Sequence, residues 1–201
     1  MKPVYAEMDD AALFEAYHRR GEEGAFAEMV SRHAAPLMRY LRGMLGADAA
    51  QVDDVFQETW IRLIDNGDKW HGGSLRAWLT RIAHNVAVDQ LRRMKPSVSL
   101  DAEPETGEAL SERLVSPEPP PDQVLEGAET ADYVAGRVAE LPPAQREVFL
   151  MRVVEGLSFK EIAEALKIPL NTALGRMHYA VSRLRAELLA NPAEWRKGGR
   201  T

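Results

Sequence analysis

The fold is decided by residues 141–185, which read LPPAQREVFLMRVVEGLSFKEIAEALKIPLNTALGRMHYAVSRLR. Proline suits the first turn of a helix, so Pro143 predicts a helix start, and that helix stops at Gly156. Ser158 and Glu161 have the spacing of a capping box, in which the side chain of each residue accepts a hydrogen bond from the backbone amide of the other. A short second helix is therefore predicted to begin at this pair.

Asn171 is a good N-cap residue, and it predicts the start of a longer third helix. A short helix, a turn of about four residues and a longer helix are typical of a helix-turn-helix, although a plain helical hairpin has the same spacing. The outward arc of the third helix could enter a DNA major groove, and it comprises Leu174, Gly175, Arg176, His178, Tyr179, Ser182 and Arg183.

The N-terminal half is predicted to be helical throughout, because its apolar residues recur every three or four positions. The expected helices span residues 10–20, 24–45 and 49–64, and a fourth begins near Ser74. In the fourth helix, Val88 and Leu91 lie off the main apolar stripe. This helix is therefore either buried on two faces or bent before Arg92.

The net charge of −6 is concentrated in the middle of the chain. Residues 96–130 hold one Arg against nine Asp and Glu, and six of the twelve prolines. With few large apolar residues, this segment cannot offset the entropy of ordering, so we interpret it as a linker. The fold class is all-α, with a helical domain (8–95), the acidic Pro-rich linker (96–130), a helix-turn-helix domain (131–190) and a tail (191–201).

The amino-acid composition excludes several kinds of site and a membrane-spanning segment. The 201 residues contain no cysteine, which excludes disulfides, thiolate metal sites and cysteine nucleophiles. No apolar run approaches the ~18–20 residues of a membrane span, and the acidic N-terminus does not look like a secretory signal. We therefore expect a cytoplasmic protein that is not inserted into a membrane.

Four stretches together make the chain resemble the extracytoplasmic-function (ECF) group of bacterial sigma factors, within the primary sigma-factor family. They occur in that family's order: AFAEMVSRHAAPLMRYLRGML (25–45), DDVFQETWIRLI (53–64), LRAWLTRIAHNVAVDQLRR (75–93) and the stretch 141–185 quoted above. The resemblance implies a protein that binds core RNA polymerase, directs it to promoters, recognises their −10 and −35 elements and helps to open the DNA.

The resemblance also assigns a polymerase-binding surface. Asp54, Gln57 and Glu58 match the family's helix that docks on the largest polymerase subunit, and their spacing puts them on one helical face. From spacing alone, an acidic face exposed to solvent explains the same residues.

For the −10 element and melting, the family pattern points to the third stretch and the residues before it. Trp70 and Asn85 match positions that receive a flipped base, which needs an aromatic surface or a polar pocket. Basic residues nearby suit phosphate contacts. The predicted set is Trp70, Arg76, Arg81, His84, Asn85, Arg92 and Arg93.

The −35 element is assigned to the helix-turn-helix, where the chain departs from its relatives. Of the basic residues that relatives carry at the start of this helix, only Arg176 remains, and His178 is a conditional one. Leu174 could contact a thymine methyl, and Gly175 could allow close backbone approach. The predicted DNA-binding set is Asn171, Thr172, Leu174, Gly175, Arg176, His178, Tyr179 and Arg183.

Other function classes explain less of the sequence. No catalytic or nucleotide-binding motif is present and no histidine pair has metal-ligand spacing, so we expect neither an enzyme nor a metal or cofactor. A free-standing helix-turn-helix regulator leaves residues 53–64 and 70–95 without a purpose. An adaptor that binds polymerase but has lost promoter reading is a further alternative. The resemblance also implies an anti-sigma partner.

Overall fold

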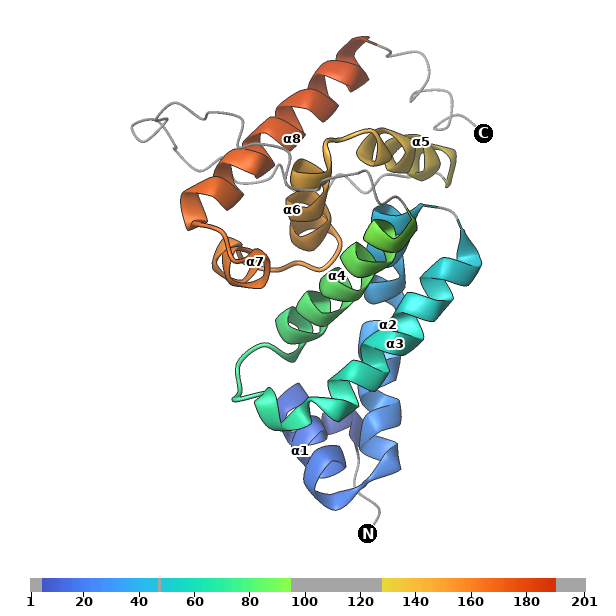
Figure 1. Cartoon of the computed structure of the whole chain (residues 1–201), viewed down its shortest axis with the longest axis vertical. Coiled ribbons are helices and arrows are strands. Elements are labelled where there is room, and N and C mark those ends of the chain that lie inside the picture. Colours follow the sequence, from blue (N-terminus) through green and yellow to red (C-terminus); the bar gives the residue numbers. More distant parts are fainter. Residues whose placement is uncertain (1–4, 47, 95–127, 191–201) are drawn as a thin grey trace.

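A computed structural model describes residues 5–46, 48–94 and 128–190 of the chain. Within these ranges every regular element is a helix, which confirms the all-α fold class (Figure 1). No helix in these ranges is long and apolar enough to cross a membrane. The elements are η1 (Tyr5–Glu7), α1 (Asp10–Arg20), α2 (Glu23–Leu45), α3 (Ala49–Asp65), η2 (Gly67–Lys69), α4 (Leu75–Met94), α5 (Ala128–Ala139), α6 (Pro143–Val153), α7 (Phe159–Leu166) and α8 (Leu170–Ala190).

Capping residues fix the ends of the N-terminal helices. Asp9 accepts a hydrogen bond from the Ala12 amide at 2.7 Å, and Gly21 ends α1 in the left-handed region at φ 65°. Asp48 caps α3 by accepting from the amides of Ala50 and Gln51. The predicted bounds of α1 are confirmed, and those of α2 and α3 are correct to one residue.

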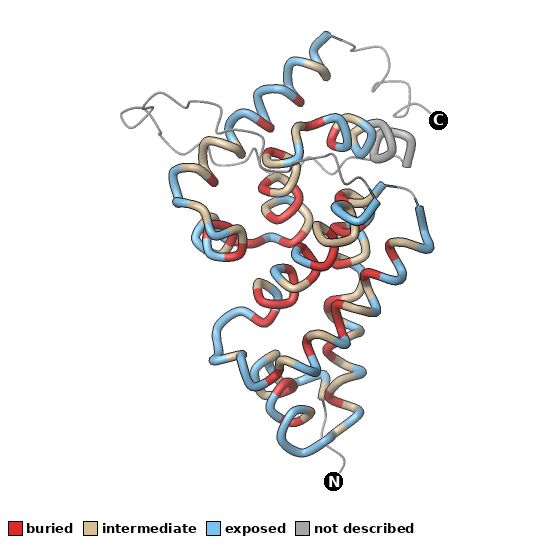
Figure 2. Tube along the Cα trace, in the orientation of Figure 1, coloured by how far each residue is buried: buried red, intermediate tan, exposed pale blue. Residues whose placement is uncertain are grey.

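α4 is buried on two faces, which resolves the alternatives left open by the sequence. It runs without interruption from Leu75 to Met94. Trp78 and Leu79 are buried on one side, while Thr80 and His84 are buried on the other. Since α2, α3 and α7 pack against it, α4 lies at the centre of the N-terminal helices (Figures 1 and 2).

A buried polar pair links α2 to α4. Tyr40 is fully buried, and its Oη lies 3.2 Å from Nδ1 of His84 in a hydrogen bond. We expect Tyr40→Phe to lower the free energy of unfolding by about 1–3 kcal/mol, because His84 Nδ1 would be left buried without its partner. Chemical denaturation measures this loss, and an unchanged midpoint would show that the bond adds nothing.

The C-terminal domain follows the predicted helix-turn-helix, with two corrections. The capping box at Ser158 and Glu161 is confirmed, since each side chain bonds the other's backbone amide. Asn171, however, is not the N-cap: α8 begins at Leu170, and the Pro169 carbonyl accepts from the amides of the first turn. The sequence also missed α5, which starts at Ala128 inside the predicted linker. The rest of that linker and the tail lie outside the described residues.

The two domains pack against each other. α7 contacts α4, and α5 and α6 contact α2. At this junction Leu150 of α6 lies so close to Gly43 that a Cβ there would come within 2.7 Å of Leu150 Cδ2. Figure 2 shows buried residues continuing from the N-terminal helices into α6. The glycine therefore makes room for the close approach of α6.

Candidate nucleic-acid interface

One face of α3 is polar and exposed, and it carries the predicted polymerase-binding residues. Val52 and Val55 are buried against α2 and α4, which turns Asp54 and Gln57 outward. Glu58 is half-buried and accepts a hydrogen bond from Arg62 Nε at 2.8 Å. One turn further, Ile61 is 51% exposed. A face that combines carboxylates with an exposed apolar side chain suits a protein partner better than DNA.

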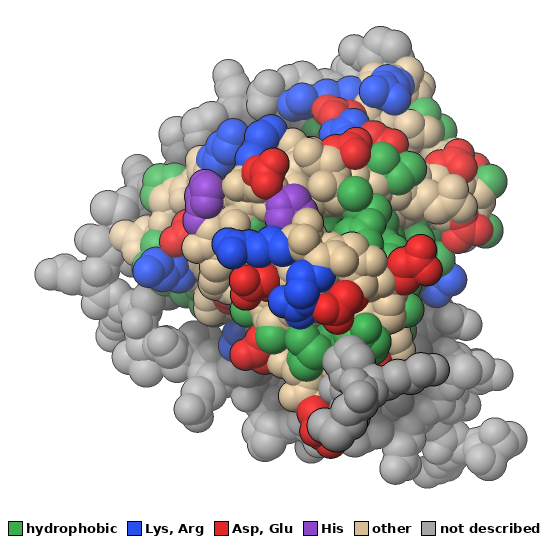
Figure 3. Space-filling model, turned by 90° about the horizontal axis from the view of Figure 1, so that it is seen from below, with side chains coloured by type: hydrophobic (Ala, Val, Ile, Leu, Met, Phe, Trp, Pro, Cys, Tyr) green, Lys and Arg blue, Asp and Glu red, His purple; other side chains and the backbone are tan. Residues whose placement is uncertain are grey.

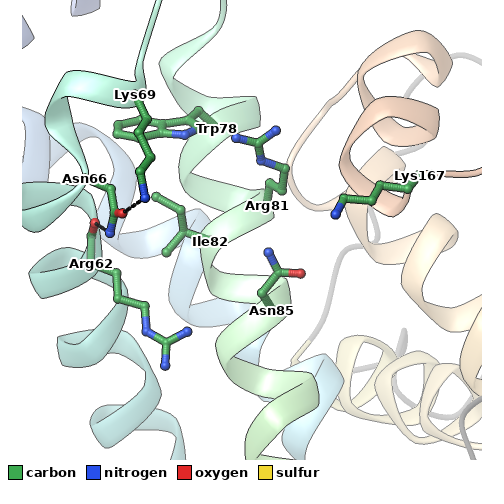
Figure 4. A pocket seen from close by; sticks show the side chains of 8 residues that line it. All are labelled: Arg62, Asn66, Lys69, Trp78, Arg81, Ile82, Asn85 and Lys167. Atoms are coloured by element: carbon green, nitrogen blue, oxygen red, sulfur yellow. Dashed lines mark hydrogen bonds between the residues drawn. The ribbon is translucent and has the colours of Figure 1, made fainter.

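A groove of about 350 Å³ lies between α3, α4 and the end of α7 (Figure 4). Asn85 is exposed on α4 and points into this groove, with Arg81 one turn before it. Lys69 Nζ donates to Asn66 Oδ1 at 2.6 Å on the opposite wall. The lining residues are Arg62, Asn66, Lys69, Trp78, Arg81, Ile82, Asn85 and Lys167.

The chemistry of the groove suits a nucleic-acid strand. Four cationic side chains provide positive potential, and the Asn85 amide can both donate and accept hydrogen bonds at a base edge. Sequence reasoning found Arg81 and Asn85 but missed Lys69 and Lys167. Lys167 adopts the left-handed region at φ 55° and ends α7, so only the packing of the two domains brings it here.

The remaining basic residues of α4 are exposed but are not gathered into one patch. Arg92 and Arg93 are exposed in its last turn. Arg76 is engaged with the other domain, since its Nη1 donates to the Glu155 carbonyl at 3.3 Å. Figure 3 shows cationic and anionic side chains interspersed on the face seen from below.

Trp70 is half-buried, although a base-receiving aromatic residue was predicted at this position. Its ring meets Phe14 edge-on with centroids 4.7 Å apart and lies 6.4 Å from Trp78. The following loop is open, with Gly72 and Gly73 at φ 95° and 89°, a backbone conformation that favours glycine. The exposed part of the predicted melting segment is therefore the loop after Trp70, residues 71–74.

His84 does not face the groove. It is 8% exposed, and burial lowers the pKa of its imidazole to about 4, so it is neutral near pH 7. The predicted DNA contact by His84 is not retained, because the same helical turn that exposes Asn85 directs His84 toward Tyr40.

On α8, only part of the predicted outward arc is exposed to solvent. His178 and Tyr179 are exposed with their rings 5.7 Å apart, and Asn171 and Arg183 are exposed as well. Thr172, Leu174, Gly175 and Arg176 are half-exposed. Arg176 lies near the Glu147 carboxyl of α6 and opposes the rise in that carboxyl's pKa. Arg176, one of the two arginines of the arc, is therefore shared with an acid of its own domain.

The domain junction contains two acids with raised pKa values. Burial raises the pKa of Glu155 to about 7, although Arg76, Thr80 and Arg39 of the N-terminal domain favour its charged form. Glu155 is only 2% exposed. Burial likewise raises the pKa of Glu147 to about 6. No sequence signal marked these acids, because their burial depends on contacts between distant segments.

Comparison with protein families gives two matches on separate parts of the chain. The Sigma-70 region 2 model matches residues 29–96, and the Sigma-70 region 4 model matches residues 132–184. The ECF RNA polymerase sigma factor SigW of Bacillus subtilis is 30% identical over 173 residues, which cover 85% of this chain and 92% of SigW.

Two solved structures share the fold. The structure of CnrH in complex with the cytosolic domain of CnrY matches with a TM-score of 0.64 and 24% identity, covering 91% of this chain and 99% of CnrH. The sigma factor RpoE from Bartonella quintana, in complex with the anti-sigma factor NepR, matches with a TM-score of 0.59 and 20% identity, covering 82% and 96%.

Proposed function

The chain belongs to the ECF RNA polymerase sigma factors, and on this premise we propose how its surfaces divide the work of transcription initiation. It binds core RNA polymerase and directs it to promoters. As an initiation factor it acts on DNA together with polymerase in the cytoplasm and carries out no reaction of its own.

The exposed face of α3 is proposed to dock on core polymerase. Asp54 and Gln57 point outward, Glu58 borders them, and Ile61 supplies an apolar contact. Protein interfaces commonly combine an apolar centre with a polar rim. Arg62 holds Glu58 and also reaches Asp89 of α4 at 3.8 Å, which fixes this face relative to the DNA-facing helix.

The groove around Asn85 is proposed to hold the unpaired strand at the −10 element. Arg81 supports it from the same helix, and Arg92 and Arg93 extend phosphate contact along α4. Arg76 joins them once its contact with Glu155 is released. Trp70 takes part through its place beside Trp78 on the groove wall.

The exposed arc of α8 is proposed to read the −35 element. In the described arrangement α7 touches α4, whereas two turns of duplex between promoter elements span about 70 Å. The domains must therefore separate before both elements are bound. The 33 residues between α4 and α5, 95–127, could reach about 110–120 Å if fully extended, which is sufficient.

Gly175 provides a test of the α8 surface. A Cβ at this position would meet nothing within 4 Å, so Gly175→Ala is expected to raise the free energy of unfolding by about 0.5–1 kcal/mol. If DNA approaches the helix backbone here, the same variant binds promoter DNA more weakly as holoenzyme. Denaturation and promoter-binding titrations measure both effects; tighter or unchanged DNA binding would remove Gly175 from the contact surface.

An anti-sigma protein is the proposed inhibitory partner. The fold is shared with RpoE, whose structure was solved with the anti-sigma factor NepR. A partner of this kind would have to cover the α3 face, the groove or the α8 arc to block initiation.

One observation carries the proposal: a single N-terminal domain presents an acidic and apolar face on α3 beside a basic groove around Asn85. The test is co-purification with core polymerase. Asp54→Ala/Gln57→Ala/Glu58→Ala is expected to weaken binding at least about tenfold, since it truncates three contacts. Glu15→Ala, an exposed acid on α1 away from this face, is the control and should bind as the wild type does. Equal binding by the triple variant would contradict the assignment.

A further inference from the structure

The turn that precedes the glycine loop is held by a helix distant in sequence. α3 ends at Asp65, η2 follows, and Ser74 caps α4 by accepting from the Ala77 amide at 3.1 Å. The local backbone bonds of the turn are short-range, such as the Trp70 amide donating to the Gly67 carbonyl. These bonds shape the turn but do not fix where it lies relative to the rest of the domain.

α1 makes the contacts that do fix it. His18 Nε2 donates to Asp68 Oδ1 at 2.8 Å, across fifty residues of sequence. The His18 ring stacks on Phe14, with centroids 5.4 Å apart and planes 19° apart. Phe14 in turn meets Trp70 edge-on at 4.7 Å. Phe14 and His18, which lie one turn apart on α1, thus contact both ends of the 67–70 turn.

Gly67 shows how closely α1 approaches. It is buried, and a Cβ at this position would lie 2.4 Å from His18 Nδ1. The backbone of Gly67 does not adopt a positive φ, so the glycine is needed here for space. His18, Gly67 and Asp68 are therefore matched to one another by fit as well as by hydrogen bonding.

Phe14 connects the same contact to the groove. Its ring lies edge-on to Trp78, with centroids 5.7 Å apart, and Trp78 lines the groove that contains Asn85. A displacement of α1 would move Trp70 and the glycine loop on one side and Trp78 on the other. The turn and the groove would then no longer present one continuous surface to a separated strand.

We infer that Phe14 and His18 are positioning residues for promoter melting, acting through the 67–70 turn and Trp70. This inference rests on the proposed function, because it concerns the step in which the −10 strand is captured. Edge-on aromatic contacts and single hydrogen bonds at the surface are individually modest. The expected losses in the rate of open-complex formation are therefore about tenfold for Phe14→Leu and about threefold for His18→Ala.

The test uses holoenzyme made from core polymerase and the full-length variants. Initiation is measured on a mapped promoter as intact duplex and on the same promoter with a mismatched, already open −10 region. Phe14→Leu, His18→Ala and Gly67→Ala are expected to bind core normally, to initiate slowly on the duplex and to recover on the open template. His18→Gln retains an N–H donor for Asp68 and should initiate close to the wild-type rate.

Arg19→Ala is the matched control, since it removes an exposed ion pair with Glu15 on α1 without touching the turn. Equal losses on both templates, failure of His18→Gln to restore the duplex rate, or a comparable loss in Arg19→Ala would each overturn the inference. If the wild type initiates on neither template, the proposed function is wrong, and the positioning role is then rejected as well. Normal initiation by Phe14→Leu and His18→Ala on the duplex would leave the proposed function intact and reject the positioning role alone.

Discussion

Replacing Asn85 with alanine is expected to reduce open-complex formation about 30- to 100-fold. Holding a base outside the helix costs a few kcal/mol, and about 1.4 kcal/mol corresponds to a factor of ten. Asn85 is the exposed amide at the centre of the groove, between the cationic groups of Arg81 and Arg62. Alanine keeps the helix and removes the hydrogen-bonding group.

Permanganate reactivity of unpaired thymines and yield of run-off transcript measure this effect on a mapped promoter. Gln90→Ala is a suitable control, because Gln90 is a half-exposed amide on the same helix that does not line the groove. It should form open complexes at close to the wild-type rate. Wild-type reactivity in the Asn85→Ala holoenzyme would remove Asn85 from the melting site.

The packed arrangement of the two domains is expected to open as pH rises, through Glu155. In this arrangement the pKa of Glu155 is about 7, against an ordinary value of 4.5 that it would regain when opening exposes it to water. The packed state thus binds the additional proton. Protonation of Glu155 therefore raises the packed-to-open ratio. This increase is complete below about pH 4.5, falls roughly tenfold per pH unit above that, and is gone above about pH 7. The full change is about two orders of magnitude in the packed-to-open ratio.

Glu155→Gln tests this linkage, because glutamine stays neutral at every pH. The variant is expected to remain packed at pH 8 and to lose most of the pH response, the remainder coming from Glu147. The chain has no cysteine, so dyes can be attached at Asp65→Cys and Arg185→Cys, two exposed positions in different domains. Energy transfer between them reports the separation from pH 4.5 to 8.

Glu140→Gln is the control for the charge change, because Glu140 is largely exposed and pairs with Arg137 within the same domain. Its pH response should match that of the wild type. A wild-type dye separation that is constant over this range, or a Glu155→Gln response as large as the wild type's, would contradict the linkage.

Local signals in the sequence predicted most of the helices correctly. The Ser158 and Glu161 capping box, the stop at Gly21 and the apolar spacing of α2 each depend on residues within a few positions of one another. Asn171 misled because it is a good cap by type and would start the helix at Thr172, whereas the turn after Lys167 lets the helix begin two residues earlier, at Leu170. α5 was missed because its first turn follows directly on the acidic segment.

The candidate sites were predicted less completely, because they depend on contacts between distant segments. Spacing placed Asp54 on an outer face of its helix, and the family resemblance singled out Asn85; both residues are exposed in the structure. Spacing could not show that Phe14 covers Trp70, that Glu147 lies near Arg176, or that Lys167 reaches the groove of the other domain. Each of these contacts joins helices that only the packing of the whole chain brings together.

The most direct test of the sigma-factor assignment is to map the 5′ ends of transcripts made from genomic fragments by core polymerase, with and without this chain. A sigma factor is expected to give new 5′ ends at defined sites only when the chain is present, with two shared sequence blocks upstream of them. Stable binding to core without any new 5′ end would instead indicate an adaptor. Specific duplex binding by the free chain, without binding to core, would indicate a free-standing regulator and contradict the account.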